Sequence, residues 1–277
     1  MKKRKIVKII ILTGLLAGLL IACDMRLKTV VYSMNTEKVS RSVRLALITD
    51  LHSCWYGKDQ KTLIDAVEKQ NPDIVLLGGD IFDDKRSYEN AETTLQYLSK
   101  NYPCYYVTGN HEYWSGDIEN ILEIVESYDV TVLRGGYDCI QVNGQEIQIC
   151  GIDDPDMVLY TETPKGIGQQ LEYLRSVHSD EKYTILLAHR PELAETYMNY
   201  QFDLVLTGHA HGGQWRIPGI INGLYAPDQG FFPKYAGGLY ELGHGKMIVS
   251  RGCARESTLA PRIFNRPELV IVEINPL

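Results

Sequence analysis

The chain alternates short apolar runs with segments in which apolar residues recur at helical spacing. Six apolar runs rich in Val, Ile, Leu and Tyr begin near residue 43, and they read VRLALITDLH, PDIVLLGGDIFD, CYYVTGNHE, IQICGIDD, YTILLAHR and FDLVLTGHAH. Runs this short and apolar predict strands buried on both faces. Residues 61–70, 91–100 and 118–127 lie between them, and their apolar spacing predicts helices. The alternation predicts an α/β fold.

The last third of the chain has a different pattern. Residues 216–257 are rich in Gly, Pro and Tyr with short apolar pieces, which predicts antiparallel strands and long loops. Residues 268–274 predict a final strand. No linker divides residues 43–277, so they form one expected domain. Residues 24–42 are a short connector with room for an edge strand near 29–33.

The N-terminus predicts a targeting or anchoring segment. The first ten residues carry five positive charges and no acid, and Ile9–Cys23 carries no charge. This pattern is typical of a signal peptide or membrane anchor. The positive-inside rule keeps the basic end in the cytoplasm and puts the domain on the extracytoplasmic face of the cell membrane. We favour an uncleaved anchor over residues 1–23. The alternative is a lipoprotein signal, because Leu20–Cys23 resembles a lipobox.

The charge of the chain argues against one class of function, nucleic-acid binding. The net charge is −7, and without the five cations of the first ten residues 23 basic and 35 acidic residues leave −12. An acidic domain of this kind argues against nucleic-acid binding.

An expected hairpin at Asn143-Gly144 pairs Cys139 with Gln148 and leaves Cys150 on the diagonal, too far for an unstrained disulfide. We therefore predict that the six cysteines are mostly buried free thiols.

Each predicted strand ends in polar residues that are competent to bind metal. Because the carboxyl ends of parallel strands meet at one edge of a sheet, these residues are expected to converge. Two carboxylates, one amide oxygen and four imidazoles are too many ligands for one ion and suit two ions of Mn, Fe or Zn. Each motif alone is weak, and their conjunction carries the prediction. The candidate ligands are Asp50, His52, Asp80, Asn110, His189, His209 and His211.

In this order, the motifs DLH, GDIFD, GNHE, AH and GHAH resemble the calcineurin-like metallophosphoesterase superfamily from Val43 to about Ile274. The segments GHAHGGQ, LYAPDQGFFPKYAGGLY and SRG resemble its membrane-anchored bacterial phosphodiesterases. The resemblance implies a four-layer α/β/β/α sandwich. It also implies two ligand sets that share one carboxylate: Asp50, His52, Asp80 and His211 for one metal, and Asp80, Asn110, His189 and His209 for the other.

The resemblance further implies roles for residues beside the ligands. His111 would stabilise the transition state or protonate the leaving oxygen, and Asp83 would orient His111. Arg190 would contact a phosphate or form a surface salt bridge. Asp153 and Asp154 would lie at the edge of the site or cap a turn. The aromatic residues of 225–240 would line a pocket for an apolar part of the substrate or pack within their own loop.

These features predict a membrane-associated, metal-dependent phosphoesterase acting on phosphate esters, most of all phosphodiesters, with a substrate that can be lipid-linked. One alternative is a pyrophosphohydrolase acting on a nucleotide-linked or lipid-linked envelope precursor. Another is a catalytically inactive scaffold of the same fold. Inactive scaffolds usually lose ligands, and here every motif ligand is present, which favours the enzyme. No protein partner is expected.

Overall fold

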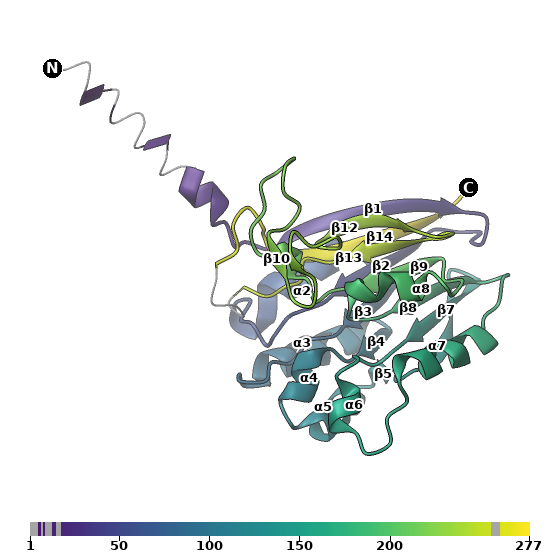
Figure 1. Ribbon diagram of the computed structural model, residues 1–277. Coiled ribbons are helices and arrows are strands. Elements are labelled where there is room, and N and C mark those ends of the chain that lie inside the picture. Colours follow the sequence, from purple (N-terminus) through teal and green to yellow (C-terminus); the bar gives the residue numbers. More distant parts are fainter. Residues whose placement is uncertain (1–4, 7, 9–12, 15–17, 256–260) are drawn as a thin grey trace.

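The computed structural model describes residues 5–6, 8, 13–14, 18–255 and 261–277 (Figure 1). The anchor expected over residues 1–23 therefore lies in part outside the described residues. Within the described part of the chain, none of the helices is long and apolar enough to span a bilayer.

The first sheet contains six strands in the order β1-β14-β2-β3-β4-β5. Strands β2 to β5 are parallel, β14 is antiparallel to β2, and β1 is parallel to β14. Helices α2 (Lys61–Glu68), α3 (Glu89–Asn101) and α5 (Ile118–Ser127) make the connections, as the apolar spacing predicted. The strands are β1 (Lys28–Thr36), β2 (Val43–Ile48), β3 (Ile74–Gly78), β4 (Cys104–Val107), β5 (Thr131–Val132) and β14 (Glu268–Pro276).

The second sheet also contains six strands, in the order β12-β13-β9-β8-β7-β6. Its four inner strands are parallel, and β12 and β6 each pair antiparallel with a neighbour. Helices α7 (Ile167–Ser176) and α8 (Ala194–Tyr197) lie in its connections. The strands are β6 (Tyr137–Val142), β7 (Gln145–Gly151), β8 (Tyr183–Leu187), β9 (Leu204–Thr207), β12 (Gly238–Leu242) and β13 (Gly245–Val249).

Three buried apolar clusters define four layers, which confirms the predicted sandwich (Figure 1). Successive side chains of a strand point to opposite faces. In β2, Leu45 and Leu47 therefore lie in the core between the two sheets, whereas Ala46 and Ile48 pack toward helices α2, α3 and α5. The outer face of the second sheet packs in the same way on α7 and α8, through residues such as Leu171 and Ala194.

Two short helices, three 3₁₀ turns and a small hairpin lie in the connections between the strands, some of them directly after a strand end. Helix α4 (Asn110–Trp114) follows β4, and α6 (Met157–Tyr160) follows β7. Single 3₁₀ turns cover η1 (Lys58–Gln60), η2 (Pro191–Leu193) and η3 (His211–Gly213). A small hairpin of β10 (Tyr225–Ala226) and β11 (Gly230–Phe231) lies in the Gly- and Pro-rich excursion after β9.

The edge strand and the antiparallel strands expected from the sequence are both present. The edge strand for which the connector left room near 29–33 forms over residues 28–36 as β1, because each of them pairs in register with β14. In the C-terminal third, β10 with β11 and β12 with β13 are antiparallel pairs as expected, and β13 also pairs parallel to β9. The hairpin at Asn143-Gly144 pairs Cys139 with Gln148 as predicted, and all six cysteines are free, four of them buried.

Candidate metal centre

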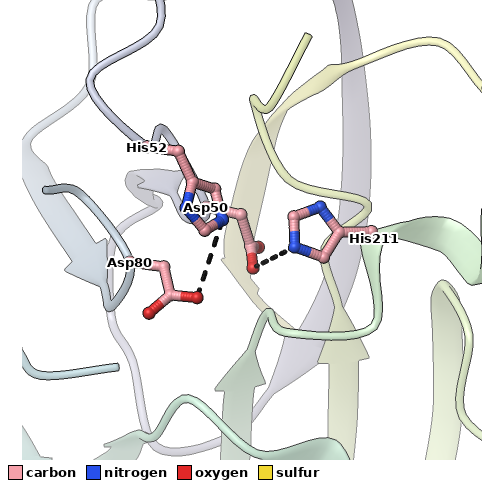
Figure 2. Close-up of side chains that lie close together, drawn as sticks. All are labelled: Asp50, His52, Asp80 and His211. Carbon is pink, nitrogen blue, oxygen red and sulfur yellow. Dashed lines mark ion pairs between the residues drawn. The ribbon is translucent and has the colours of Figure 1, made fainter. Parts of the chain in front are cut away.

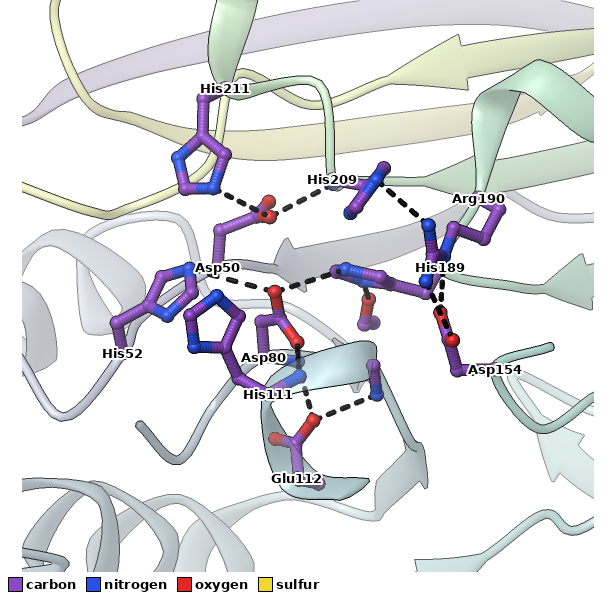
Figure 3. Close-up of polar contacts among 12 residues, drawn as sticks. Asp50, His52, Asp80, His111, Glu112, Asp154, His189, Arg190, His209 and His211 are labelled. Atoms are coloured by element: carbon purple, nitrogen blue, oxygen red, sulfur yellow. Dashed lines mark hydrogen bonds and ion pairs between the residues drawn. The ribbon is translucent and has the colours of Figure 1, made fainter. Parts of the chain in front are cut away.

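The predicted ligands follow the carboxyl ends of five strands from both sheets and converge at one edge of the sandwich (Figure 3). Asp50 and His52 follow β2, and Asp80 follows β3. Asn110 begins α4 after β4. The remaining three follow β8 and β9. All seven side chains are buried. The strand pattern therefore positions the site, because each strand delivers its polar end to the same edge.

The backbone at these residues is strained. Asp50 (φ 49°), His52 (φ 48°), Asp80 (φ 52°), His209 (φ 62°) and His211 (φ 46°) all have left-handed backbone conformations. Such a conformation costs about 1–3 kcal/mol for a residue other than glycine and concentrates at functional sites. Gly79 (φ 85°) turns the chain ahead of Asp80, where a Cβ atom would lie 2.6 Å from His189 Nδ1. The fold therefore keeps these side chains directed at the site although their backbone conformations are unfavourable.

One group of possible ligands contains Asp50, His52, Asp80 and His211 (Figure 2). One ligand atom from each lies within 4.8 Å of the others. His52 Nε2 lies 3.6 Å from Asp80 Oδ2, and His211 Nε2 lies 3.6 Å from Asp50 Oδ1. Burial first, and then the positive charges of His52 and Arg262, hold the pKa of His211 well below its ordinary value. A neutral imidazole is the form that binds metal.

A second group contains Asp80, His189 and His209, so Asp80 belongs to both groups. His189 Nδ1 donates to the Gly78 carbonyl at 2.9 Å, and its Nε2 lies 3.2 Å from Asp80 Oδ2. His209 Nε2 donates to Asp228 Oδ2 at 2.9 Å, which leaves Nδ1 for an ion. Holding one imidazole nitrogen in a hydrogen bond fixes the tautomer and aims the other nitrogen.

The unpaired atoms of the cluster fit metal ions. Buried polar atoms normally have hydrogen-bond partners. Here a set of them makes no hydrogen bond with the residues that the structure describes, although Asp80 Oδ2 and His189 Nε2 lie within ion-pair distance of each other. The set comprises Asp50 Oδ2, His52 Nε2, Asp80 Oδ2, Asn110 Oδ1 and His189 Nε2. All are oxygen or imidazole nitrogen atoms, the donor types that suit Mn, Fe and Zn. Together with the shared carboxylate, they suggest a dinuclear divalent metal centre.

Glu112 is a buried residue of the site that the sequence analysis missed. Its carboxylate accepts hydrogen bonds from the backbone N–H groups of Asp80 (2.9 Å), Ile81 (2.7 Å), Phe82 (3.1 Å) and Gly109 (2.8 Å). Burial, and then the charge of Asp80, raise its pKa to about 7. Glu112 thus ties the loop after β3 to the start of α4. Its place beside Asn110 and His111 in the GNHE motif was the available signal.

His111 has a different partner from the one expected. Its Nδ1 lies 2.8 Å from Asp84 Oδ1, whereas Asp83 Oδ2 lies 3.4 Å from His52 Nδ1. The expected orientation of His111 by Asp83 is corrected on this point: Asp84 makes the hydrogen bond to His111, and Asp83 lies within 4.8 Å of both His52 and His111. The His111 ring meets the His52 ring edge-on at 4.3 Å between centroids, and Trp114 lies 4.9 Å on another side.

Arg190 is buried, so a surface salt bridge is excluded. Its Nε and Nη2 donate to the two oxygens of Asp154 at 2.6 and 2.9 Å, and its Nη1 lies 3.1 Å from His209 Nε2 (Figure 3). The same Nη1 donates to Asp228. These carboxylates occupy the donors that a phosphate would need. Arg190 therefore holds His209 through Asp228, and Asp154 lies behind the site. Asp153 accepts bonds from Thr108 and Tyr113 instead.

Arg262 is a second residue that the sequence analysis did not single out. It is buried, its Nη1 donates to the Arg251 carbonyl at 2.8 Å, and its Nη2 lies 3.3 Å from His211 Nδ1. Asn265 donates to the carbonyl of the same histidine at 2.7 Å. The contacts of Arg262 and Asn265 with His211 join residues about fifty positions apart, so no local sequence motif predicts them.

Comparison with known proteins agrees with this architecture. The family model for calcineurin-like phosphoesterases matches residues 43–213. The metallophosphoesterase YkuE of Bacillus subtilis is 29% identical over 82% of this chain and 77% of its own. A Danio rerio protein named as a transmembrane protein with a metallophosphoesterase domain is 31% identical over 96% of this chain and 62% of its own.

A solved dimetal phosphatase from Danio rerio superimposes with a TM-score of 0.51 at 12% identity, over 77% of this chain and 88% of its own, which shows a shared fold. The chain spans about half the length of several other curated relatives, 47% in two cases. The family match covers more than half of the chain, so the chain belongs to the calcineurin-like phosphoesterase family. Family membership and the Asp and His cluster together support metal-dependent hydrolysis of phosphoric esters.

Proposed function

We propose that this protein hydrolyses phosphodiesters at a membrane surface, using two metal ions held by the seven buried ligands. The observation that carries the proposal is the Asp80 carboxylate, which is shared by two groups of buried ligand atoms. Asp50, His52 and His211 would complete one site, and Asn110, His189 and His209 the other. Mn, Fe and Zn suit these donors. Bound there, the ions would polarise phosphoryl oxygens and lower the pKa of water.

His111 is proposed as the group that delivers a proton to the leaving oxygen. Its Nδ1–H donates to Asp84 at 2.8 Å, which leaves Nε2 as the nitrogen that meets substrate. Burial lowers the pKa of His111, while the charges of Asp80 and Asp84 oppose this shift. Histidine is the side chain that most often serves in general acid catalysis. Asp84 aligns the His111 ring through this hydrogen bond, so Asp84 is the positioning residue for His111.

A preference for diesters is supported by an apolar surface beside His111. The Trp114 ring lies 4.9 Å from the His111 ring and is about half exposed, with its Nε1 donating to Asp156 at 2.8 Å. A phosphodiester carries organic groups on both sides of phosphorus, so the group that leaves can rest on this ring while the other remains on the far side. The motif resemblance to membrane-anchored phosphodiesterases points the same way.

The membrane location is a proposal that rests on the N-terminal sequence. Five basic residues precede an uncharged stretch, Ile9–Cys23, which suits an anchor with the domain outside the cytoplasm. The relative from Danio rerio that is named as a transmembrane protein gives further support. Fractionation of cells that express the full chain, followed by protease treatment of intact cells, tests both attachment and sidedness.

The test of activity compares three substrates with the full chain in detergent. An aryl phosphodiester, the matching monoester and a pyrophosphate-linked nucleotide would be offered to metal-stripped protein, and then after addition of Mn²⁺, Fe²⁺ or Zn²⁺. We expect metal to restore diester hydrolysis, and the double variant Asp80→Asn, His209→Ala to stay inactive. Cleavage of the pyrophosphate alone would favour the pyrophosphohydrolase instead. A folded protein with no bound metal and no activity would be a scaffold.

A further inference from the structure

A cavity of about 400 Å³ lies between Arg216 and Arg251, outside the metal cluster. Its lining combines the two arginines Arg216 and Arg251 with the apolar residues Ile220, Ile221 and Phe264. A cavity with paired cations and an adjoining apolar wall suits a ligand that carries an anionic group on an apolar body.

The charge in this cavity is not neutralised by the protein. Arg216 makes no ion pair with any residue that the structure describes, and its side chain donates to the Gly212 carbonyl at 3.2 Å and to Asn222. Burial and the neighbouring charge of Arg251 lower its pKa to about 10, which leaves it charged at neutral pH. Arg251 pairs with the buried Glu268 through Nε at 3.0 Å. Two cations thus share one carboxylate in a chain whose net charge is −7.

Exposed apolar side chains also lie on the excursion after β9, the segment that supplies most of the cavity lining. Ile220 is 81% exposed, Phe231 71% and Phe232 67%. Trp215 and Tyr225 are about half exposed and line one small apolar pocket together, and the Tyr225 and Phe231 rings lie 5.4 Å apart. We call these five residues the loop surface. Single exposed apolar residues are ordinary, but a cluster of this kind marks an interaction surface.

The loop surface lies beside the point where the N-terminal segment leaves the domain. The backbone N–H of Phe264 donates to the Ala22 carbonyl at 2.7 Å, and Arg266 holds the carbonyls of Arg26 and Leu27 at 2.8 and 3.1 Å. In Figure 1, the helical residues 18–22 lie next to the loops around β10. Among them, the apolar residues Leu19, Leu20 and Ile21 are exposed. The cavity, which Phe264 lines, and the loops that carry the loop surface therefore both lie beside the N-terminal segment.

We propose that this face rests on a lipid bilayer, with the loop surface in the interface and the phosphate of an anionic lipid headgroup between Arg216 and Arg251. Aromatic and aliphatic side chains with nearby arginines are the usual composition of an interfacial surface. The site is close to the metal centre: Gly212 follows His211, and Arg262 joins Arg251 to that histidine. This inference rests on the proposed membrane location and does not require the proposed hydrolysis.

The test uses the fluorescence of Trp215 in the full chain reconstituted into vesicles. The chain has three tryptophans, so Trp55→Phe and Trp114→Phe leave Trp215 as the only one. Vesicles would contain a brominated, and therefore quenching, phosphatidylcholine or a brominated phosphatidylglycerol at the same mole fraction. We expect both lipids to quench Trp215, and the anionic lipid about twofold more strongly, because basic residues near a membrane attract anionic headgroups.

Matched variants separate the two parts of the proposal. Arg216→Gln should abolish the excess quenching by phosphatidylglycerol, and the variant should fold because Arg216 makes no ion pair within the described residues. Arg175→Gln, on helix α7, should keep the excess. Phe231→Ser with Phe232→Ser should reduce quenching by both lipids. Absence of quenching in inserted protein would overturn the proposal and indicate that water or a second copy covers this face.

Equal quenching by the two lipids would overturn the headgroup site. A Trp215 emission shift on addition of inorganic phosphate in detergent, without excess quenching by phosphatidylglycerol in vesicles, would likewise overturn the lipid assignment and indicate a site for soluble phosphate.

Discussion

His189 lies 3.2 Å from Asp80 through Nε2 while its Nδ1 is held by the Gly78 carbonyl. The imidazole therefore cannot rotate away from the carboxylate that both ligand groups share. Burial alone would lower the pKa of His189, but the Asp80 carboxylate raises it to about 10. In the metal-free protein this histidine is consequently an imidazolium paired with Asp80, and a metal ion has to displace its proton.

We predict that metal binding releases about one proton through His189 at about pH 7.5, because metal ligands must be deprotonated. Since the pKa is raised, affinity should rise with pH up to about 10 and fall at lower pH. Calorimetric titration of Mn²⁺ in buffers of different ionisation enthalpy measures the released protons. His178→Ala, at a histidine that pairs with Asp180 outside the cluster, is the control and should leave the release unchanged. Proton release near zero in the native chain would contradict the assignment.

The His189–Asp80 pair should also make the stability of the metal-free protein depend on pH. A raised folded pKa means that the His189–Asp80 pair stabilises the metal-free protein fully below the ordinary histidine pKa of 6.5, and that this stability is lost as the pH rises toward about 10. Chemical denaturation of the metal-free chain across this range should show that contribution, and His189→Ala should remove it.

Asp83 and Asp84 are adjacent in sequence and should have separable effects. Asp84→Asn weakens the hold on His111, so we expect kcat to fall by about tenfold or more while metal affinity stays unchanged, because a general acid contributes about 10²–10⁴-fold. Asp83→Asn instead loses the contact to His52, and a change beside a metal ligand typically costs about 10–100-fold in affinity. Kinetics at saturating metal, together with metal titration, separate the two. An identical profile for both variants would refute the distinct contacts.

Glu112→Gln should loosen the loop that holds Asp80. The glutamine amide would place N–H groups against backbone donors that now meet a carboxylate oxygen, and an unsatisfied buried donor costs about 1–3 kcal/mol. We expect lower thermal stability and weaker metal binding together. Glu119→Gln on the exposed side of α5 is the matched control, and it should change neither measurement.

Arg190→Gln should destabilise the fold rather than only weaken substrate binding. Removing one partner of a buried ion pair costs about 3–5 kcal/mol, because the other charge stays buried. Here Asp154 would be left without its two-pronged partner. For the exposed pair of Arg175 and Glu172, loss of the partner should cost less than about 1 kcal/mol. Denaturant unfolding of Arg190→Gln and Arg175→Gln compares the two, and equal stability of both variants would contradict a structural role for Arg190.

The sequence alone determined the succession of strands and helices and the set of candidate ligands, and the resemblance of its motifs implied the four layers. A short apolar run is a local property, so it predicted strands such as β2, whose Leu45 and Ala46 face opposite cores. Parallel strands carry their carboxyl ends to one edge, and this rule brought Asp50, Asp80 and His209 together without any knowledge of loop geometry. The strand pairing of residues 28–36 was weaker in sequence because an edge strand carries few buried side chains.

Only the tertiary structure decided which partner each of these side chains meets. The direction of a side chain in a loop depends on backbone dihedral angles and on packing against distant segments. Neither can be predicted from the spacing of residues in the sequence. Asp84 rather than Asp83 therefore reaches His111, and Arg190 faces Asp154 and Asp228 instead of substrate. The same holds for the cavity, where Arg216 and Arg251 meet only because the excursion after β9 folds back beside β13 and β14.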